Sequence, residues 1–219
     1  MAPCKAPATA LIIMLPGAYD TPQDFVRHGF VKAVRDRNIS ADVVMADTHI
    51  GYYHDDLVVT RLHDDLIMPA RQKGYTQIWL AGISLGGYGS MLYSKRHGEA
   101  IDGMFLMAPF LGNRTLRAEI LKAGGLVGWQ AGDVAATDHD RQLWAWLKGY
   151  DRTDIQSRHL YPQLYLGYGT EDRFASSSQA LATVMPPNQV MTTNGGHDWA
   201  PWQRLWGDFL DHNKLPKCV

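Results

Sequence analysis

The chain has 219 residues, of which 46% are hydrophobic and 20% are charged, and its formal net charge is −1. This length allows one well-packed α/β domain and is short for two. The near-neutral charge gives no electrostatic case for binding nucleic acid or an anionic membrane surface. The nine histidines form no Cys/His cluster with zinc spacing. We therefore expect neither a metal site nor a cofactor.

The two cysteines, Cys4 and Cys218, lie at opposite ends of the chain. Our first interpretation is that both are surface thiols in a reducing compartment. The alternative is a disulfide that joins the termini, which needs an oxidising compartment. The first apolar run, Ala10–Leu15, is too short to span a membrane, and Pro16-Gly17 ends it before a helix pattern begins. We therefore expect a cytoplasmic protein without a membrane span, of unknown oligomeric state.

Six apolar, strand-like runs alternate with helix-like segments along the chain. The runs lack in–out alternation, which is typical of strands covered on both faces. Strand–helix–strand repetition favours a parallel sheet with right-handed crossovers. The predicted strands are about Ala10–Leu15, Ala41–Ala46, Ile78–Ile83, Met104–Ala108, Gln163–Gly167 and Gln189–Thr193.

Helix signals fill the segments between these strands. Thr21 and Pro22 are typical of a helix start, and the apolar side chains of this first helix recur as far as Val34. A second helix is predicted at about 56–73, with a kink at Pro69. The other helices of the sheet layers are predicted from Tyr88 to about Gly98 and at about Ala200–His212.

The connection between the fourth and fifth strands is about fifty residues long, well beyond an ordinary connection. It contains two helix patterns, Thr115–Ala123 and Asp140–Lys148, and glycine-rich sequence between them that carries Trp129. We predict a single domain over residues 1–219 with a small lid or cap inserted at about 111–160. The alternative is an ordinary pair of packing helices.

The most informative stretch is Gly82-x-Ser84-x-Gly86, which follows a predicted strand and precedes a predicted helix. This context indicates a nucleophile elbow, whereas the same letters alone could be an ordinary glycine-rich turn. The turn is too sharp for side chains at Gly82 and Gly86. It sets the Ser84 hydroxyl at the start of a helix, where free backbone N–H groups, including that of Leu85, face the group under attack.

A serine hydroxyl needs a neighbouring base before it acts as a nucleophile, and histidine is the usual base. His197 follows the last strand in a glycine-rich loop, so it lies at the same sheet edge as Ser84. We predict that His197 is the base and that Asp172, in the turn after the fifth strand, is its orienting acid. Glu171 is the alternative acid. Asp198 adjoins the histidine, and we expect it to be structural.

A tetrahedral intermediate also needs hydrogen-bond donors for its negative oxygen. The N–H of Leu85 is one predicted donor. The second should come from the loop after the first strand, where Gly17 allows a close approach and the amide of Ala18 or Tyr19 would face the site. The aromatic residues expected nearby favour an acyl or aryl group over a highly charged substrate. The predicted substrate contacts are Tyr19, Phe110, Trp129, Phe174 and Trp199.

With these motifs the chain resembles the α/β-hydrolase superfamily, as a small serine esterase-like member with a short lid insertion. The matching motifs are Gly82-x-Ser84-x-Gly86-Gly87, Leu15-Pro16-Gly17-Ala18, Gly169-x-x-Asp172 and Gly195-Gly196-His197. The resemblance implies an α/β fold with an open, mostly parallel six-stranded sheet in the order 2-1-3-4-5-6, helices on both faces and a site at the carboxyl ends of the strands. The chain departs from the family where Pro16 stands in place of a common histidine.

A serine nucleophile argues against the branches of this superfamily that use aspartate or cysteine. The remaining expectation is hydrolysis of a carboxylic ester or thioester of small size, through an acyl-serine intermediate formed by Ser84, His197 and Asp172. Two alternatives stay open. One is an acyltransferase that uses the same three residues, and the other is a non-catalytic binding protein that has kept the fold.

Overall fold

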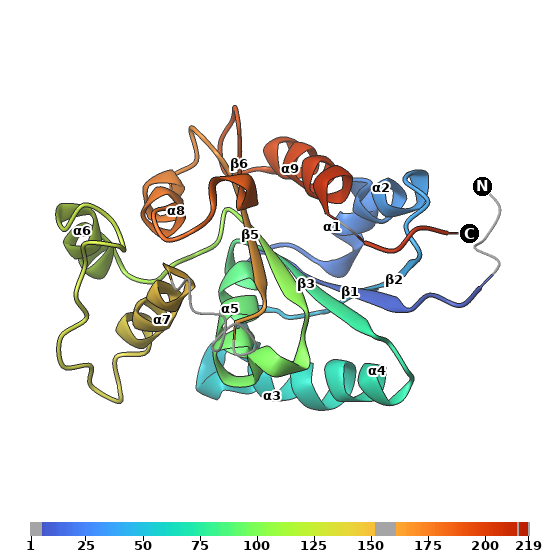
Figure 1. Cartoon of the computed structure of the whole chain (residues 1–219), viewed down its shortest axis with the longest axis horizontal. Helices are drawn as coiled ribbons and strands as arrows, with labels where there is room; N and C mark the ends of the chain where they lie inside the picture. Colours follow the sequence, from blue (N-terminus) through green and yellow to red (C-terminus); the bar gives the residue numbers. More distant parts are fainter. Residues whose placement is uncertain (1–5, 152–160, 214, 219) are drawn as a thin grey trace.

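The computed structural model describes residues 6–151, 161–213 and 215–218, with the backbone alone at 54–56. At its centre lies one sheet of six parallel strands in the order β2-β1-β3-β4-β5-β6 (Figure 1). The strands are β1 (Ala10–Leu15), β2 (Ala41–Met45), β3 (Gln77–Ile83), β4 (Gly103–Met107), β5 (Gln163–Gly169) and β6 (Val190–Thr193). The predicted α/β class, strand order and parallel arrangement are confirmed, and the strand ends agree to within about two residues, the usual uncertainty of such boundaries.

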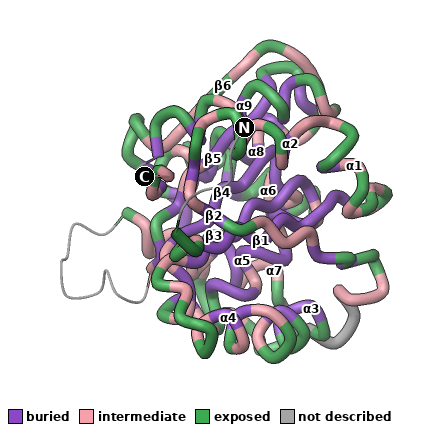
Figure 2. Tube along the Cα trace, turned by 90° about the vertical axis from the view of Figure 1, so that its right-hand side faces the viewer, coloured by how far each residue is buried: buried purple, intermediate pink, exposed green. Residues whose placement is uncertain are grey.

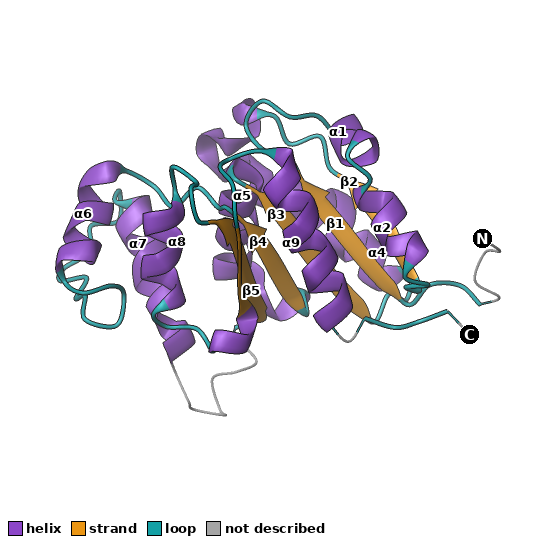
Figure 3. Ribbon diagram, turned by 90° about the horizontal axis from the view of Figure 1, so that it is seen from above, coloured by secondary structure: helices purple, strands orange, loops and turns teal. Residues whose placement is uncertain are grey.

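Helices cover both faces of this sheet (Figure 3). One face carries α1 (Pro22–Arg27), α2 (Phe30–Asp36) and α9 (Trp199–His212). The other carries α3 (Leu57–Arg61), α4 (Met68–Gln72) and α5 (Leu85–His97), with α6 (Arg114–Lys122), α7 (His139–Leu147) and α8 (Ala175–Ala182) packed against the same apolar cluster. Short 3-10 turns occupy Ile50–Asp56, Gly98–Ala100, Lys148–Asp151 and Pro187–Gln189.

The core consists of two apolar layers, one on each side of the sheet, because successive strand residues point to opposite faces. In β4, for example, Met104 and Leu106 belong to the layer under α5, whereas Phe105 and Met107 belong to the layer under α9. Phe105 stacks on Phe209 of α9 with ring centroids 4.5 Å apart. Buried residues therefore run along the strands through the centre of the molecule (Figure 2). Burial of each such large side chain stabilises the fold by about 1.5–3 kcal/mol.

Two predicted helices are less regular than expected. The first is divided into α1 and α2 at Gly29, whose φ of +73° is left-handed and ends a helix. The second contains a π-helical segment, Leu62–Ile67, directly before α4. Pro69 has no N–H to donate, and its ring crowds the preceding helical turn. The wider π-helical turn makes room for this ring, so the irregularity lies one turn before the kink predicted at Pro69.

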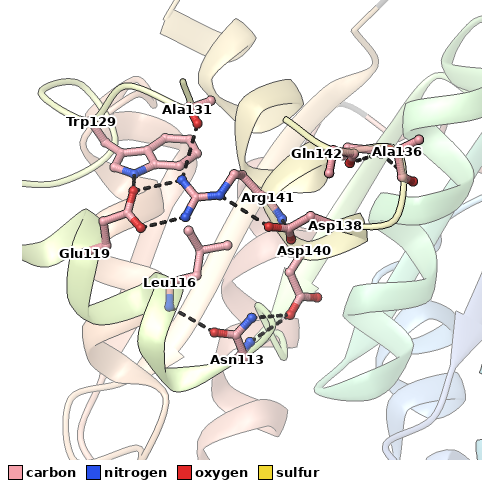
Figure 4. A network of polar contacts seen from close by, with 11 residues as sticks. Asn113, Leu116, Glu119, Trp129, Ala131, Ala136, Asp138, Asp140, Arg141 and Gln142 are labelled. Atoms are coloured by element: carbon pink, nitrogen blue, oxygen red, sulfur yellow. Dashed lines mark hydrogen bonds and ion pairs between the residues drawn. The ribbon is translucent and has the colours of Figure 1, made fainter. Parts of the chain in front are cut away.

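The described part of the predicted insertion is held together by a polar network between α6 and α7 (Figure 4). The Arg141 guanidinium of α7 donates to both carboxylate oxygens of Glu119 of α6, at 2.8 and 2.6 Å. The indole N–H of Trp129 donates to the same carboxylate at 2.7 Å, and Asp138 accepts a third bond from Arg141 at 3.3 Å. These contacts join the two helices and the segment between them. Residues 152–160 of the predicted insertion lie outside the described residues.

The two cysteines, for which we predicted surface thiols, lie at the two ends of the chain. Cys4 lies outside the described residues, whereas Cys218 is disulfide-bonded, which corrects the first interpretation of a free thiol at this position. The Cys218 N–H donates to the carbonyl of Asn38 at 2.7 Å, and Lys217 pairs with Ile39, so the C-terminal segment is fixed beside the start of β2. Within the described ranges, no helix combines the length and the apolar character needed to cross a membrane.

The α6–α7 network should make stability depend on pH in acid. Hydrogen bonds from Arg141 and Trp129 hold the pKa of Glu119 at about 2, below its ordinary value of 4.5. A carboxylate with a lowered folded pKa stabilises the fold above its unfolded pKa and loses this contribution as the pH falls from about 4.5 to about 2. Glu119→Gln should therefore lower the melting temperature at pH 7 and lower it less at pH 3, measured by circular dichroism. An equal decrease at both pH values would contradict this account.

Candidate active site

Ser84 lies in a strained turn between β3 and α5. Its φ of +50° and ψ of −110° fall in a region that non-glycine residues rarely adopt, at a cost of about 1–3 kcal/mol. The Ser84 N–H donates to the carbonyl of Met107 at 3.0 Å, and the Ser84 carbonyl accepts from the N–H of Phe110 at 2.9 Å. Met107 is the last residue of β4 and Phe110 lies just after it, so the neighbouring strand and its following turn hold the strained residue in place. The backbone at Ser84 is therefore a strained turn from strand to helix.

The glycines of the elbow are required by close backbone contacts. A Cβ at Gly82 would lie 2.4 Å from the carbonyl oxygen of Gly86. A Cβ at Gly86 would lie 2.1 Å from the carbonyl oxygen of Leu15, at the end of β1. Real Cβ atoms do not come this close to backbone, so both positions need glycine, as predicted from the sequence.

His197 and Asp172 are brought together at the same edge of the sheet. His197 Nδ1 lies 2.7 Å from Asp172 Oδ2, and the Asp172 side chain is fully buried. The other oxygen, Oδ1, accepts the N–H of Phe174 at 2.7 Å. The rings of Phe174 and Trp202 each make a T-shaped contact with the imidazole, at 5.0 Å between centroids. The ring is therefore fixed, with Nε2 on the edge opposite Asp172.

The two other acids near this loop have different positions. Glu171 is exposed, and its N–H donates to the carbonyl of Gly195 at 3.1 Å. Asp198 Oδ1 accepts the N–H of Ala200 at 3.0 Å and so caps α9. The hydrogen bond to His197 is thus made by Asp172, and Asp198 has the structural role expected for it.

A cleft of about 270 Å³ lies beside Ser84. Residues 17–20, after β1, form one wall, and four residues at or just before the start of α9 form the other: His197, Asp198, Trp199 and Trp202. Ser84 and Arg173 complete the lining. All these segments follow the carboxyl ends of parallel strands, which is where ligands bind in open α/β sheets.

Of the predicted oxyanion donors, Ala18 and Tyr19 line this cleft, and Leu85 directly follows Ser84 in the chain. Leu85 is the first residue of α5, and the first N–H groups of a helix have no intrahelical partner. The turn after β1 is closed by the Asp20 N–H, which donates to the carbonyl of Gly17 at 3.2 Å and leaves Ala18 and Tyr19 at its centre. In the part of the chain that the structure describes, the amides of Ala18 and Tyr19 have no hydrogen-bond acceptor.

The predicted substrate contacts fall into two groups. Tyr19, 95% exposed, stands at the cleft, and Trp199 lines it. Phe174 contacts His197, and Phe110 packs against Phe174 at 6.0 Å between centroids. Trp129, by contrast, is 2% exposed and lies in the core of the insertion, under the Arg141 guanidinium. The structure does not bring Trp129 to the cleft, because its indole is committed to the α6–α7 network.

Two charged residues of the cleft were not selected from the sequence, Asp20 and Arg173. Asp20 ends the loop that carries the predicted amide donors, and Arg173 directly follows Asp172. Their closeness in sequence to predicted site residues could therefore have indicated that both line the cleft. Burial raises the pKa of Asp20 above its ordinary value. No three acidic, histidine or cysteine side chains among the described residues are grouped in a way that could hold a metal ion.

The chain is similar to known proteins in its three-dimensional structure, whereas the sequence comparisons find no match. No protein-family model matches the chain, and no curated protein matches it in sequence. The fluorophosphonate-binding serine hydrolase FphF of Staphylococcus aureus, with substrate bound, is similar in structure with a TM-score of 0.65 and 15% identity, over 95% of this chain and 85% of that one. The S-formylglutathione hydrolase FrmB of Staphylococcus aureus has a TM-score of 0.63 and 15% identity, over 97% and 84%. A monoacylglycerol lipase of Paleococcus ferrophilus has a TM-score of 0.54 and 12% identity, over 95% and 96%. At these identities the likeness shows the α/β-hydrolase fold.

The contact at Gly86 generates a stability prediction. Gly86→Ala should lower the free energy of unfolding by about 3 kcal/mol, since the new methyl group meets rigid backbone at the end of β1. Urea unfolding measures this change. Gly207→Ala in α9 is the matched control, because the nearest atom to its Cβ is the flexible end of Arg37 at 3.2 Å. It should be neutral or stabilise by up to about 1 kcal/mol. Equal effects of the two substitutions would contradict the elbow geometry.

Proposed function

We propose that the protein is a serine hydrolase, most simply a carboxylesterase, in which Ser84 is the nucleophile, His197 the general base and Asp172 the orienting acid. The observation that carries the proposal is the 2.7 Å hydrogen bond between a fully buried Asp172 and His197, whose ring lines the same cleft as Ser84. A base oriented by a third group beside a nucleophile is the arrangement that nucleophilic catalysis needs. Serine hydrolases and esterases among the structural neighbours support the proposal.

In the proposed mechanism His197 Nε2 takes the proton of the Ser84 hydroxyl while Oγ attacks the carbonyl carbon of the ester. The resulting oxyanion is bound by the N–H of Leu85 and an amide of the 17–20 turn. When the intermediate collapses, the imidazolium returns its proton to the leaving alcohol or thiol, and an acyl-Ser84 remains. Water, activated by His197, then releases the acid and regenerates the serine. Asp172 holds the ring and stabilises the imidazolium throughout.

The size of the cleft favours a small substrate. Its volume of about 270 Å³ is just below the range of roughly 300–1,000 Å³ found for sites that bind drug-sized ligands. Trp199 and Trp202 give it an aromatic wall, and Tyr19 provides an exposed ring at its edge. No described residue of the 111–151 segment lines the cleft. We propose short-chain esters or thioesters as substrates, and the lid role of the insertion stays a prediction.

The compartment also stays a prediction. The cytoplasmic location expected from the sequence rests on the short first apolar run. The disulfide at Cys218 favours an oxidising compartment instead, since disulfides are rare where thiols are kept reduced.

Two alternative functions use the same fold. An acyltransferase would pass the acyl group from Ser84 to an alcohol or amine, and product analysis with competing nucleophiles separates it from a hydrolase. The strained backbone of Ser84 disfavours a non-catalytic binding protein. Such strain lowers the stability of the fold, and it is found mainly at functional sites, where it is part of the mechanism.

Covalent labelling tests the proposed function. A fluorophosphonate probe should label the wild type, and Ser84→Ala should abolish both labelling and p-nitrophenyl acetate hydrolysis. Asp172→Asn should lower kcat by about 10⁴-fold, because the ring loses its orienting charge. Ser94→Ala is the control, since this buried serine lies on α5 and donates to Ser90. Folded wild-type protein that is not labelled would contradict the proposal.

The substrate prediction is tested with p-nitrophenyl esters and thioesters of graded chain length. kcat/KM should be highest for acetyl or butyryl groups and at least about tenfold lower for dodecanoyl, a difference of about 1.4 kcal/mol. Trp129→Phe should leave this profile unchanged, because Trp129 is buried away from the cleft. A preference for long chains, or a profile altered by Trp129→Phe, would favour the lid interpretation instead.

A further inference from the structure

Arg173 is the one lysine or arginine among the described residues that line the cleft beside Ser84. It lies in the turn after β5, directly after Asp172. Its side chain is exposed, and no hydrogen bond or ion pair joins it to another residue of the described ranges. The N–H groups of its guanidinium are therefore open to a ligand that enters the cleft.

The ring of Phe174 holds the Arg173 side chain in a defined place. The guanidinium carbon lies over this ring, 5.0 Å from its centroid, within the distance at which an aromatic face attracts a cation. Phe174 is held in turn by its own N–H, which donates to Asp172 Oδ1 at 2.7 Å, and by an edge contact with Phe110. The guanidinium is planar, and its N–H fork matches the two oxygens of a carboxylate.

The same ring connects Arg173 with the proposed base. Phe174 makes its T-shaped contact with His197 at 5.0 Å between centroids, so the guanidinium and the imidazole both pack on one aromatic side chain. In ester hydrolysis the imidazolium returns its proton to the leaving oxygen, so this oxygen must lie beside His197. A substituent on the leaving alcohol or thiol can therefore extend into the part of the cleft that Arg173 lines.

The two acids of the cleft lining have other positions. Asp20 follows β1, whereas Arg173 follows β5, and β3 and β4 lie between these strands. With strands about 4.8 Å apart, the two residues begin on opposite sides of Ser84, which follows β3. The Asp198 carboxylate accepts the N–H of Ala200 and caps α9. Within the described part of the chain, neither acid forms an ion pair with the guanidinium.

We propose that Arg173 is a specificity-determining residue that binds a carboxylate on the leaving group of the ester or thioester. The inference rests on the proposed function and adds a substrate class to it, namely short acyl groups on a phenol, alcohol or thiol that carries one negative charge. Because Arg173 is exposed, the ion pair should raise kcat/KM by only about fivefold. Such a difference still separates acidic esters from neutral ones.

A pair of phenyl esters tests this assignment. 4-Acetoxybenzoate carries a carboxylate on its leaving phenol and is hydrolysed to acetate and 4-hydroxybenzoate, whereas 4-acetoxybenzamide has nearly the same shape without the charge. Arg173→Gln should lower the ratio of kcat/KM for the acid to that for the amide by about fivefold and leave kcat/KM for the amide unchanged. Arg173→Lys should restore part of the ratio, because it keeps the charge but not the fork.

Salt and a distant arginine provide the controls. Raising NaCl from about 0.05 to about 0.5 M should lower the ratio in the wild type, because ions screen an exposed pair, and should not change it in Arg173→Gln. Arg114→Gln removes an exposed guanidinium at the start of α6, outside the cleft lining, and should leave the ratio at the wild-type value.

Fluorophosphonate labelling distinguishes failure of this inference from failure of the proposed function. 4-Hydroxybenzoate should slow labelling of the wild type at lower concentration than 4-hydroxybenzamide does, and Arg173→Gln should remove this difference. Wild type that is not labelled would refute the proposed function itself. Labelled wild type that the two compounds protect equally, or a ratio that Arg173→Gln leaves unchanged or changes only as much as Arg114→Gln does, would overturn the role of Arg173.

Discussion

The position of Ser84 depends on a backbone contact between the elbow and the end of β1. Gly86 lies so close to the Leu15 carbonyl that no side chain fits between them, and this brings the 17–20 turn next to the serine. The end of β4, at Met107, and Phe110 just after it hold the other side of the elbow. The remaining groups reach the same place because parallel strands present all their carboxyl ends at one edge. The backbone of the sheet therefore sets the position of the segments that carry the site residues.

Much of this arrangement could be predicted from the chain because its causes are local. Strands buried on both faces are continuous apolar runs, and glycines are required wherever backbone meets backbone, as at Gly82 and Gly86. The three candidate catalytic residues lie within four residues of a strand's end: Ser84 after β3, Asp172 after β5 and His197 after β6. They could therefore be predicted once the strands were located. The resemblance to α/β hydrolases supplied the strand order, which local patterns alone do not specify.

Other features depend on contacts between distant segments. Trp129 lies in glycine-rich sequence that suits a surface loop, and only Glu119 and Arg141 make it part of a core. Gly29 divides the first helix, although the apolar spacing runs through it without a break. Asp20 is one of many acids in the sequence, and only the fold places it in the cleft beside Ser84 and His197. Such pairings arise from tertiary packing, which overrides local pattern.

The aromatic wall of the cleft has a practical consequence. Of the seven tryptophans in the chain, Trp199 and Trp202 line the cleft, and each also contacts an imidazole, of His28 and His197 respectively. Indole emission responds to the polarity and protonation of its neighbours. Intrinsic fluorescence should therefore report occupancy of the cleft directly, so that ligands can be screened on unlabelled protein even when no turnover is observed.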